Sequence, residues 1–322
     1  EGWDYFTDST RNVRMPAEDL PWVAVTGLGA HLKAPPTRLV IQHKGKVDEI
    51  PLRRIPHLLV IGGHTLHSSV VTTLIKNGIP VSFFEADGTP VGVVRAYGDT
   101  RDTGMRALQV SAPKHRYAVT IAKGSLASRL LLLEKLEEVH GAPLFYEGEL
   151  AFLHKASDEL EYLIKLDEIR RLHRLTTDMY YEILARFAPP ELGFRRRTAR
   201  PRQDPVNAML SLGYAMLYGA AMVPVLASRL DPDLGLLHEG PGSLVHDLID
   251  PFKPVMVDLP VLMIAVNGIP ENGYELSADR CLLSDDLVVA LQAAIKSTIV
   301  ASRINEQVQV LCGALCNGGT FT

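Results

Sequence analysis

The first hundred residues carry short hydrophobic runs of the kind that form β-strands. Arg38–Gln42 and Val47–Leu52 alternate between polar and apolar residues on either side of a His-Lys-Gly-Lys turn, which predicts a β-hairpin. His57–Ile61 is a short apolar run that ends at two glycines and predicts another strand. Pro80–Phe84 and Val91–Val94 flank an Ala-Asp-Gly-Thr turn and predict a second hairpin. This part of the chain is therefore expected to be rich in strands.

Helical spacing of apolar residues occurs once in that first part and dominates the chain from Arg116 onward. Leu66–Asn77 repeats its apolar residues at helical intervals and is followed by a glycine, which is a typical helix stop. Longer helices are predicted for Val119–Leu136, Leu160–Phe187, Pro205–Ser228 and Ser284–Gln309.

The fold predicted from these patterns is an α+β multidomain protein. Residues 1–100 would form an N-terminal β-rich domain of short strands plus one helix, and residues 101–322 a C-terminal all-α domain. The boundary falls near residues 98–105, where strand patterns give way to helical ones. A length of 322 residues agrees with two domains, because one hydrophobic core seldom serves so long a chain.

One predicted helix requires a test for membrane insertion. Pro205–Ser228 is uncharged and long enough to span a bilayer. It also contains Asn207, Ser211 and Pro224, and such polar or helix-weakening residues are costly in contact with lipid. We therefore expect a buried helix at the centre of the helical domain and no membrane association. Three cysteines provide no disulfide framework and indicate a cytoplasmic protein.

Charge adds one candidate binding segment. The formal net charge is −4, so a nucleic-acid site would have to be a local patch rather than the whole surface. Five arginines crowd one proline-containing loop, and they are Arg195, Arg196, Arg197, Arg200 and Arg202. Guanidinium groups match phosphate oxygens, which favours contact with DNA, but a simple solvated loop is equally compatible with the run.

The segment Gly235–Pro254 is the main candidate for chemistry. His238 is expected in a loop, Asp247 and Asp250 on one face of a helix, and Lys253 one turn further on. Imidazole and carboxylate are the ligands of hydrolytic and phosphotransfer metal sites. A purely structural alternative has Ser243 as the helix N-cap and the two acids stabilised by the helix dipole. Spacing alone favours this capping arrangement.

Three motifs in sequence order resemble the CRISPR-associated spacer-acquisition integrase, the endonuclease subunit of the CRISPR adaptation complex. They are GGHTLHSSVVTTLIKNGIPVSFFEADGTPVG, ARPRQDPVNAMLSLGYAMLYG and LDPDLGLLHEGPGSLVHDLIDPFKPVMVD. The resemblance implies insertion of short DNA fragments into a CRISPR array by transesterification at the repeat, with a divalent metal such as Mg or Mn. It also implies a homodimer formed through the β-rich domain and a small dimeric CRISPR-associated partner protein.

The same resemblance implies roles for individual residues. In that family a glutamate, a histidine and an acidic residue hold the metal, and His238 and Asp250 match the second and third of these. Asp247 matches an acid beside them, and the arginines of residues 195–202 would contact DNA. The resemblance further assigns a basic residue and two polar residues to the same cleft, and these are Lys253, Asn207 and Tyr218.

The chain departs from the family at the glutamate, where His173 stands. None of the residues that share the helical face of His173 carries a carboxylate that could replace it. A set of His173, His238 and Asp250 would suit Mn or another transition metal better than Mg, which prefers oxygen ligands.

Three hypotheses follow from this departure. The chain is an integrase that uses a transition metal, or a divergent member with a weakened site that holds DNA as a structural subunit. The third hypothesis is a metal-dependent repair nuclease unrelated to CRISPR, which would act without any small partner protein.

Overall fold

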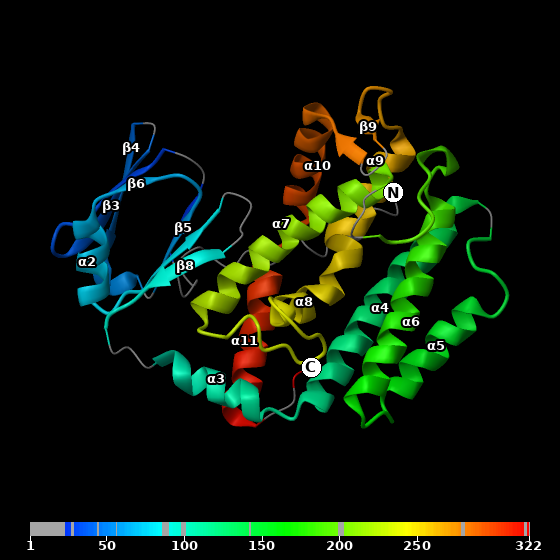
Figure 1. Cartoon of the computed structure of the whole chain (residues 1–322), viewed down its shortest axis with the longest axis horizontal. Coiled ribbons are helices and arrows are strands. Elements are labelled where there is room, and N and C mark those ends of the chain that lie inside the picture. The colour runs from blue at the N-terminus through cyan, green and yellow to red at the C-terminus, as the bar shows by residue number, and fades with distance from the viewer. Residues whose placement is uncertain are drawn as a thin grey trace.

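The structure, a computed structural model, describes residues 23–26, 29–43, 45–55, 57–85, 90–97, 101–141, 143–198, 203–277, 281–318 and 321. Figure 1 shows a small β-rich part, drawn in blue and cyan, beside a larger helical part that runs from green to red. The predicted class, strands first and helices after, is confirmed.

The β-rich part contains two four-stranded sheets. One has the order β1-β5-β7-β8, in which β8 is antiparallel to β7 and the other pairs are parallel; the second has the order β4-β3-β2-β6. Its strands are β1 Val23–Thr26, β2 His31–Lys33, β3 Arg38–His43, β4 Lys46–Pro51, β5 Leu58–Ile61, β6 Thr65–Leu66, β7 Val81–Phe84 and β8 Pro90–Val94. The 3-10 turn η2 (Leu52–Arg54) and the helix α2 (Ser68–Lys76) complete it.

Both predicted hairpins pair as expected, β3 with β4 and β7 with β8, although the turn at residues 86–89 lies outside the described residues. The predicted helix begins two residues late, because Thr65 and Leu66 pair with β2 as a short parallel strand. The helix packs its buried residues Val70 and Leu74 into a core with Leu58 and other strand residues.

The helical part begins at α3, directly after residues 98–100, which are outside the described part of the chain. Its elements are α3 Arg101–Ser111, α4 Lys114–His140, α5 Glu149–Leu160, α6 Leu166–Phe187, η3 Pro190–Leu192, α7 Pro205–Ala227, α8 Ser243–Ile249, η4 Asp250–Phe252, the π-helical turn η5 Pro254–Asp258, α9 Leu259–Asn267, β9 Tyr274–Leu276, β10 Cys281–Leu283, α10 Asp285–Thr298 and α11 Ala301–Asn317.

Three details of the helical part differ from the sequence prediction. The helix expected over residues 160–187 is α6 alone, since α5 ends at Leu160 and a short connection intervenes. The late helix expected over residues 284–309 is two helices, α10 and α11, which meet at an angle of 54°. The small antiparallel pair of β9 and β10 was not predicted, so the part is not purely helical.

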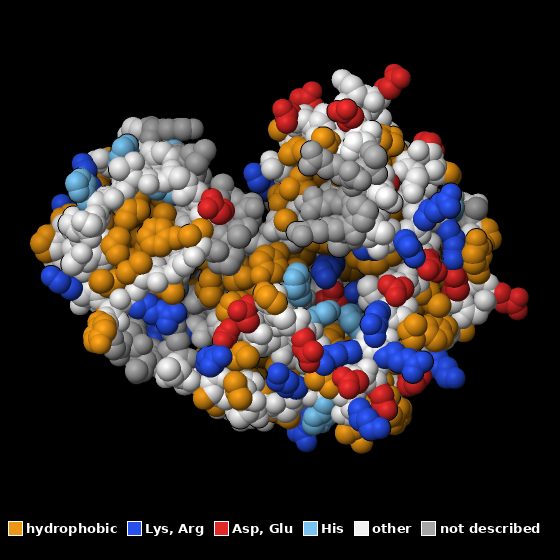
Figure 2. All heavy atoms as spheres, viewed as in Figure 1, with side chains coloured by type: hydrophobic (Ala, Val, Ile, Leu, Met, Phe, Trp, Pro, Cys, Tyr) orange, Lys and Arg blue, Asp and Glu red, His pale blue; other side chains and the backbone are white. Residues whose placement is uncertain are grey.

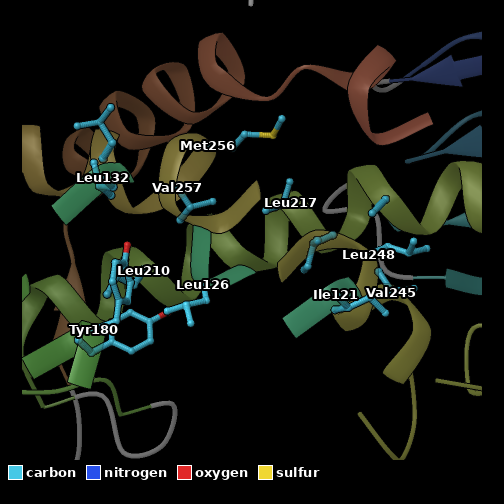
Figure 3. Packing of buried hydrophobic residues seen from close by; sticks show 14 of the residues in the cluster. Ile121, Leu126, Leu132, Tyr180, Leu210, Leu217, Val245, Leu248, Met256 and Val257 are labelled. Carbon is cyan, nitrogen blue, oxygen red and sulfur yellow. The ribbon is translucent and has the colours of Figure 1, made fainter. Parts of the chain in front are cut away.

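The helix α7 runs through the middle of the helical part. By length and composition it could cross a membrane, as could α10 and α11 taken as one bent pair. In the structure α7 packs against α8, α9, α10 and α11, and Figure 3 shows its Leu210 and Leu217 among buried residues of neighbouring elements. Gly213 allows this close packing, because a Cβ atom there would lie 2.5 Å from Cγ1 of Val257. Half of the most apolar stretch of α7 is buried inside the structure.

The two parts of the chain share buried contacts. Leu59 and Phe84 of the β-rich part belong to the same hydrophobic cluster as the helical residues. His57, which is buried, lies 2.9 Å through Nε2 from the Ser82 hydroxyl. Burial lowers the pKa of His57 to about 4, the charge of Arg229 contributes to the lowering, and a hydrogen bond with the Ala227 backbone opposes it.

Acid is expected to destabilise the protein partly through His57. Folded His57 stays neutral down to about pH 4, whereas the unfolded residue protonates below its ordinary pKa of about 6.5, so stability is lost as pH falls through this window. At pH 5 the loss from this residue is about 2 kcal/mol. Urea unfolding at pH 7 and pH 5 should show a pH dependence smaller by that amount in His57→Gln. Equal pH dependence in the two proteins would contradict the assignment.

Candidate functional site

Asp247 anchors the loop that precedes α8. Its side chain is fully buried, and its carboxylate accepts hydrogen bonds from the backbone N–H groups of Leu236 (2.5 Å), Leu237 (3.1 Å) and His238 (2.8 Å). Three such bonds on one carboxylate hold the loop in a single conformation.

The capping arrangement that spacing favoured is wrong. The residue before α8 is Gly242, and the Ser243 hydroxyl instead accepts from the Gly235 N–H (2.9 Å) and donates to the Asp233 carbonyl (3.0 Å). Asp247 lies near the C-terminal end of this seven-residue helix, where the helix dipole does not favour an acid.

His238 is oriented by the acid that anchors its loop. Nδ1 of the ring lies 2.7 Å from Oδ1 of Asp247, and the side chain is 38% exposed. His238 belongs to the lining of a cavity, and no described residue hydrogen-bonds its Nε2 atom. A buried carboxylate on one ring nitrogen fixes the tautomer and leaves the other nitrogen as an acceptor.

Asp250 is the centre of a buried ion network. It is 2% exposed, and Oδ2 accepts from the Ser125 hydroxyl and from the Arg129 guanidinium (2.9 Å) and lies 3.1 Å from Nε2 of His173. Oδ1 accepts from the Lys253 ammonium at 2.7 Å. Burial alone would raise the pKa of Asp250, but the charges of Lys253 and Arg129 hold it well below its usual range. The carboxylate is thus ionised and already paired on both oxygens.

His173 lies on α6 between Asp250 and His238. Its ring meets the His238 ring edge-on, with centroids 5.5 Å apart. Burial, the largest influence, lowers its pKa to about 3 against the opposing charge of Asp250, so His173 is neutral near pH 7. Its Nδ1 is the one buried side-chain nitrogen or oxygen among the described residues that lacks a hydrogen-bond partner.

His173, His238 and Asp250 line a cavity of about 520 Å³ in the helical part. In the space-filling view, histidine side chains gather there with blue cationic and red acidic ones (Figure 2). Its cationic lining residues outnumber its three acids, Asp178, Glu239 and Asp250. The cationic residues are Arg129, Arg170, Arg174, Arg197 and Lys253. A cavity with this surplus of positive charge attracts anions, phosphate among them.

Of the three loop arginines that the structure describes, one lines the cavity. Arg197 donates to the Asn207 side-chain oxygen (2.9 Å) and the Ser211 hydroxyl (3.0 Å), and its guanidinium lies 5.3 Å from the Tyr214 ring centre. Arg195 and Arg196 are exposed and do not line the cavity. The predictions for Arg200 and Arg202 concern residues outside the described part of the chain.

Two further predicted members of the cleft are placed elsewhere. Asn207 is 1% exposed and does not line the cavity, because its amide accepts from the Thr198 N–H (2.8 Å) and donates to Asp204 (2.7 Å). Asn207 therefore holds the basic loop in place through hydrogen bonds and does not contact the cavity. Tyr218 also lies outside the lining, with its ring 5.1 Å from that of His246.

Sequence reasoning missed Ser125 and Arg129, both buried on α4 and both bound to Asp250. A charged residue at the position of Arg129, among the buried leucines of that helix, is the signal that could have revealed it. A second missed group is Asp258, which is fully buried and accepts hydrogen bonds from Tyr180 (2.6 Å) and Tyr214. Burial raises the pKa of Asp258 to about 6.

The donor set around Asp250 does not suit the divalent metal that the resemblance implies. Both oxygens of Asp250 are engaged, and two of the donors, Arg129 and Lys253, are cations that would repel a metal ion. Within the described ranges, no group of three His, Cys, Asp or Glu side chains is placed to hold a metal. The arrangement therefore does not fit a three-ligand metal centre, and metal dependence stays a prediction.

Comparison with known proteins decides the family. Residues 23–297 match the family described as CRISPR associated protein Cas1. The chain belongs to the Cas1 family. The resemblance seen in the three sequence motifs is thereby confirmed.

Curated Cas1 relatives support the same assignment. A putative CRISPR-associated endonuclease Cas1 of Methanospirillum hungatei is 40% identical over 297 residues, which cover 92% of this chain and 98% of the relative. A CRISPR-associated endonuclease Cas1 of Thermus thermophilus is 34% identical over 249 residues, 76% of each chain.

Solved structures at lower identity share the Cas1 fold. A casposase bound to its integration product has a TM-score of 0.74 at 17% identity, covering 93% of this chain and 96% of the casposase. A chain from a partial Cas6-RT-Cas1–Cas2 complex has a TM-score of 0.70 at 20% identity, covering 93% of this chain and 96% of that chain. A Cas1–DNA complex has a TM-score of 0.57 at 18% identity, covering 92% and 98%.

Proposed function

We propose that this Cas1-family chain acts in spacer acquisition and binds duplex or branched DNA with a backbone phosphate in the cationic cavity. The observation that carries the proposal is the arrangement around Asp250. Its negative charge is cancelled by Arg129 and Lys253, so that it does not oppose an anion bound in the cavity. Phosphate contacts of this kind supply most of the affinity of proteins for DNA.

Besides Arg129, three arginines line the cavity, and they differ in their contacts. Arg170 holds the loop of His238, since it donates to the Leu237 carbonyl (2.6 Å) and pairs with Glu239 (2.6 Å). Arg197 is held by hydrogen bonds to Asn207 and Ser211 of α7. Arg174 is exposed, lines the cavity and makes no hydrogen bond or ion pair with a described residue, so it is the best placed of the three to take a DNA phosphate.

The names of similar proteins support the partners in this proposal. The similar chains include one bound to DNA, one in a Cas1–Cas2 complex and a casposase bound to an integration product. We extend these partners to this chain, with DNA as substrate and a small dimeric CRISPR-associated protein beside it. A homodimer formed through the β-rich part belongs to the same proposal.

Arg174→Gln is expected to weaken binding of branched DNA several-fold and to lower the slope of log affinity against log salt by about 1. Arg171→Gln is the matched control, because Arg171 is exposed on the same helix but does not line the cavity. Fluorescence anisotropy with labelled DNA over a range of salt concentrations measures both effects. Equal weakening in the two variants would place the DNA elsewhere and refute the proposed cavity.

A further inference from the structure

A second cavity lies between the β-rich part and the helical part and shares no lining residue with the cavity around Asp250. Its volume is about 200 Å³, and we call it the boundary cavity. Figure 1 shows β8 beside the C-terminal end of α7, and these two segments form its opposite walls. The lining includes Val91, Val93 and Arg95 from the β-rich part and Leu226, Arg229 and Pro232 from the helical part.

The strand pattern brings one cationic side chain to the boundary cavity. Val91, Val93 and Arg95 are spaced two residues apart, so their side chains lie on one face of β8 and its continuation. All three line the cavity. The two valines are 64% and 40% exposed, so much of their apolar surface is left without a protein contact. This wall therefore offers apolar contact and a positive charge side by side.

Arg229 reaches the boundary cavity from the helical part through an uncommon backbone conformation. Its φ is 62°, and it is the one non-glycine residue among the described ranges with a positive φ. The turn is held by hydrogen bonds from the Arg229 N–H to the Leu226 carbonyl (3.0 Å) and from the Leu230 N–H to the Val225 carbonyl (3.1 Å). This conformation is unfavourable for residues with a Cβ atom, and such outliers concentrate where ligands bind.

No described acidic residue lies in the lining to neutralise the two arginines. Asp231, the acid closest to Arg229 in sequence, pairs with Arg106 at 2.8 Å instead. Burial is the main cause of the low pKa of His57, and the charges of Arg229 and Arg95 add to it, which agrees with both guanidinium groups lying near this ring. Like charges that face one cavity repel each other, and an anion between them removes the repulsion.

The buried polar residues of the lining are neutral and already paired. Nε2 of His57 lies 2.9 Å from the Ser82 hydroxyl, and the ring also hydrogen-bonds the Ala227 backbone. His57 is 4% and Ser82 2% exposed. A ligand in the boundary cavity therefore meets apolar side chains and two guanidinium groups rather than a series of open hydrogen-bond donors. This combination favours a charged head on an apolar body.

We propose that the boundary cavity binds a small organic anion, a carboxylate on a short aliphatic group, which bridges Arg95 of the β-rich part and Arg229 of the helical part. Guanidinium groups pair with carboxylate oxygens in a forked geometry, and the valines of β8 contact the aliphatic group. The volume is below the roughly 300–1,000 Å³ of cavities that hold drug-sized ligands, which excludes a nucleotide. Since each part supplies one of the two cations, the bound anion holds the two parts in one relative position.

The test uses the full chain with labelled valine and leucine methyl groups, observed by NMR, and isovalerate as the probe. Isovalerate is expected to shift the methyl signals of Val91, Val93 and Leu226 and to saturate in the millimolar range, because so small a ligand makes few contacts. Isovaleramide, its uncharged counterpart, is expected to bind at least about 10-fold more weakly. Inorganic phosphate keeps the charge but lacks the aliphatic group, and it should also bind more weakly than isovalerate.

Two variants test the two cations separately. Arg229→Asn removes the charge and keeps a residue that tolerates a positive φ, and it is expected to weaken isovalerate binding at least about 10-fold. Arg95→Gln should have the same effect from the opposite wall. Arg54→Gln is the matched control, because Arg54 is an exposed arginine of the β-rich part outside the lining, and this variant should bind as the wild type does.

Three results would overturn the proposal. The first is binding of isovaleramide or phosphate as tight as that of isovalerate. The second is isovalerate binding that Arg229→Asn and Arg95→Gln leave unchanged. The third is a set of methyl shifts at Val91 and Val93 without one at Leu226, which would contradict the bridge between the two parts. The test contains no DNA, so each of these results leaves the proposed function standing.

Discussion

Replacement of Arg129 by methionine is expected to lower the free energy of unfolding by about 3–5 kcal/mol. The guanidinium is 3% exposed and pairs with Asp250, which is 2% exposed, so its removal leaves a buried carboxylate with too little compensating charge. Urea denaturation at pH 7 measures the change.

Arg174→Met is the matched control for this prediction, because the side chain is exposed and the expected change is within about 0.5 kcal/mol. The double variant Arg129→Met, Asp250→Asn should recover part of the loss, since a neutral amide needs no cation. A loss in Arg129→Met no greater than in Arg174→Met would show that the ion network does not stabilise the fold.

The second large effect is expected from His173→Glu, which places at this position the glutamate that the sequence resemblance implies. Two carboxylates about 3 Å apart cannot both ionise without a cation between them, and carboxylate oxygens are ligands that Mg²⁺ and Mn²⁺ accept. The variant should bind Mn²⁺ at least about 10-fold more tightly than the wild type, as titration calorimetry at pH 7 would show.

His173→Gln serves as the control, since it is neutral and of similar length. Wild-type protein that binds Mn²⁺ as tightly as His173→Glu would contradict this prediction. That result would favour the two-histidine, one-carboxylate metal site that the sequence suggested, with His173, His238 and Asp250 as ligands.

The sequence was sufficient for the fold class and for part of the cavity lining. His173, His238, Asp250 and Lys253 do meet around one cavity, as predicted. Periodicity was enough for the long helices, because their apolar faces are continuous. It could not show where α6 begins or that the last helix bends, because such breaks depend on packing rather than on composition.

The partners of Asp250 were missed for a different reason. Arg129 lies on a helix whose outer face is rich in lysine, arginine and glutamate, so its charge resembles that of its exposed neighbours. Asp247 was assigned to a helix start because spacing does not show that α8 has only seven residues. The role of Asn207 depended on a loop that folds back over α7, which no local pattern encodes.

The sequence distance between Asp250 and its partners has a consequence for synthesis. Ser125 and Arg129 precede Asp250 by 125 and 121 residues, so α4 leaves the ribosome long before its partner acid does. During that interval Arg129 lacks the carboxylate that pairs with it in the folded protein. A chain released before Asp250 would therefore lack the carboxylate at the centre of the ion network that Arg129 and Lys253 share in the folded protein.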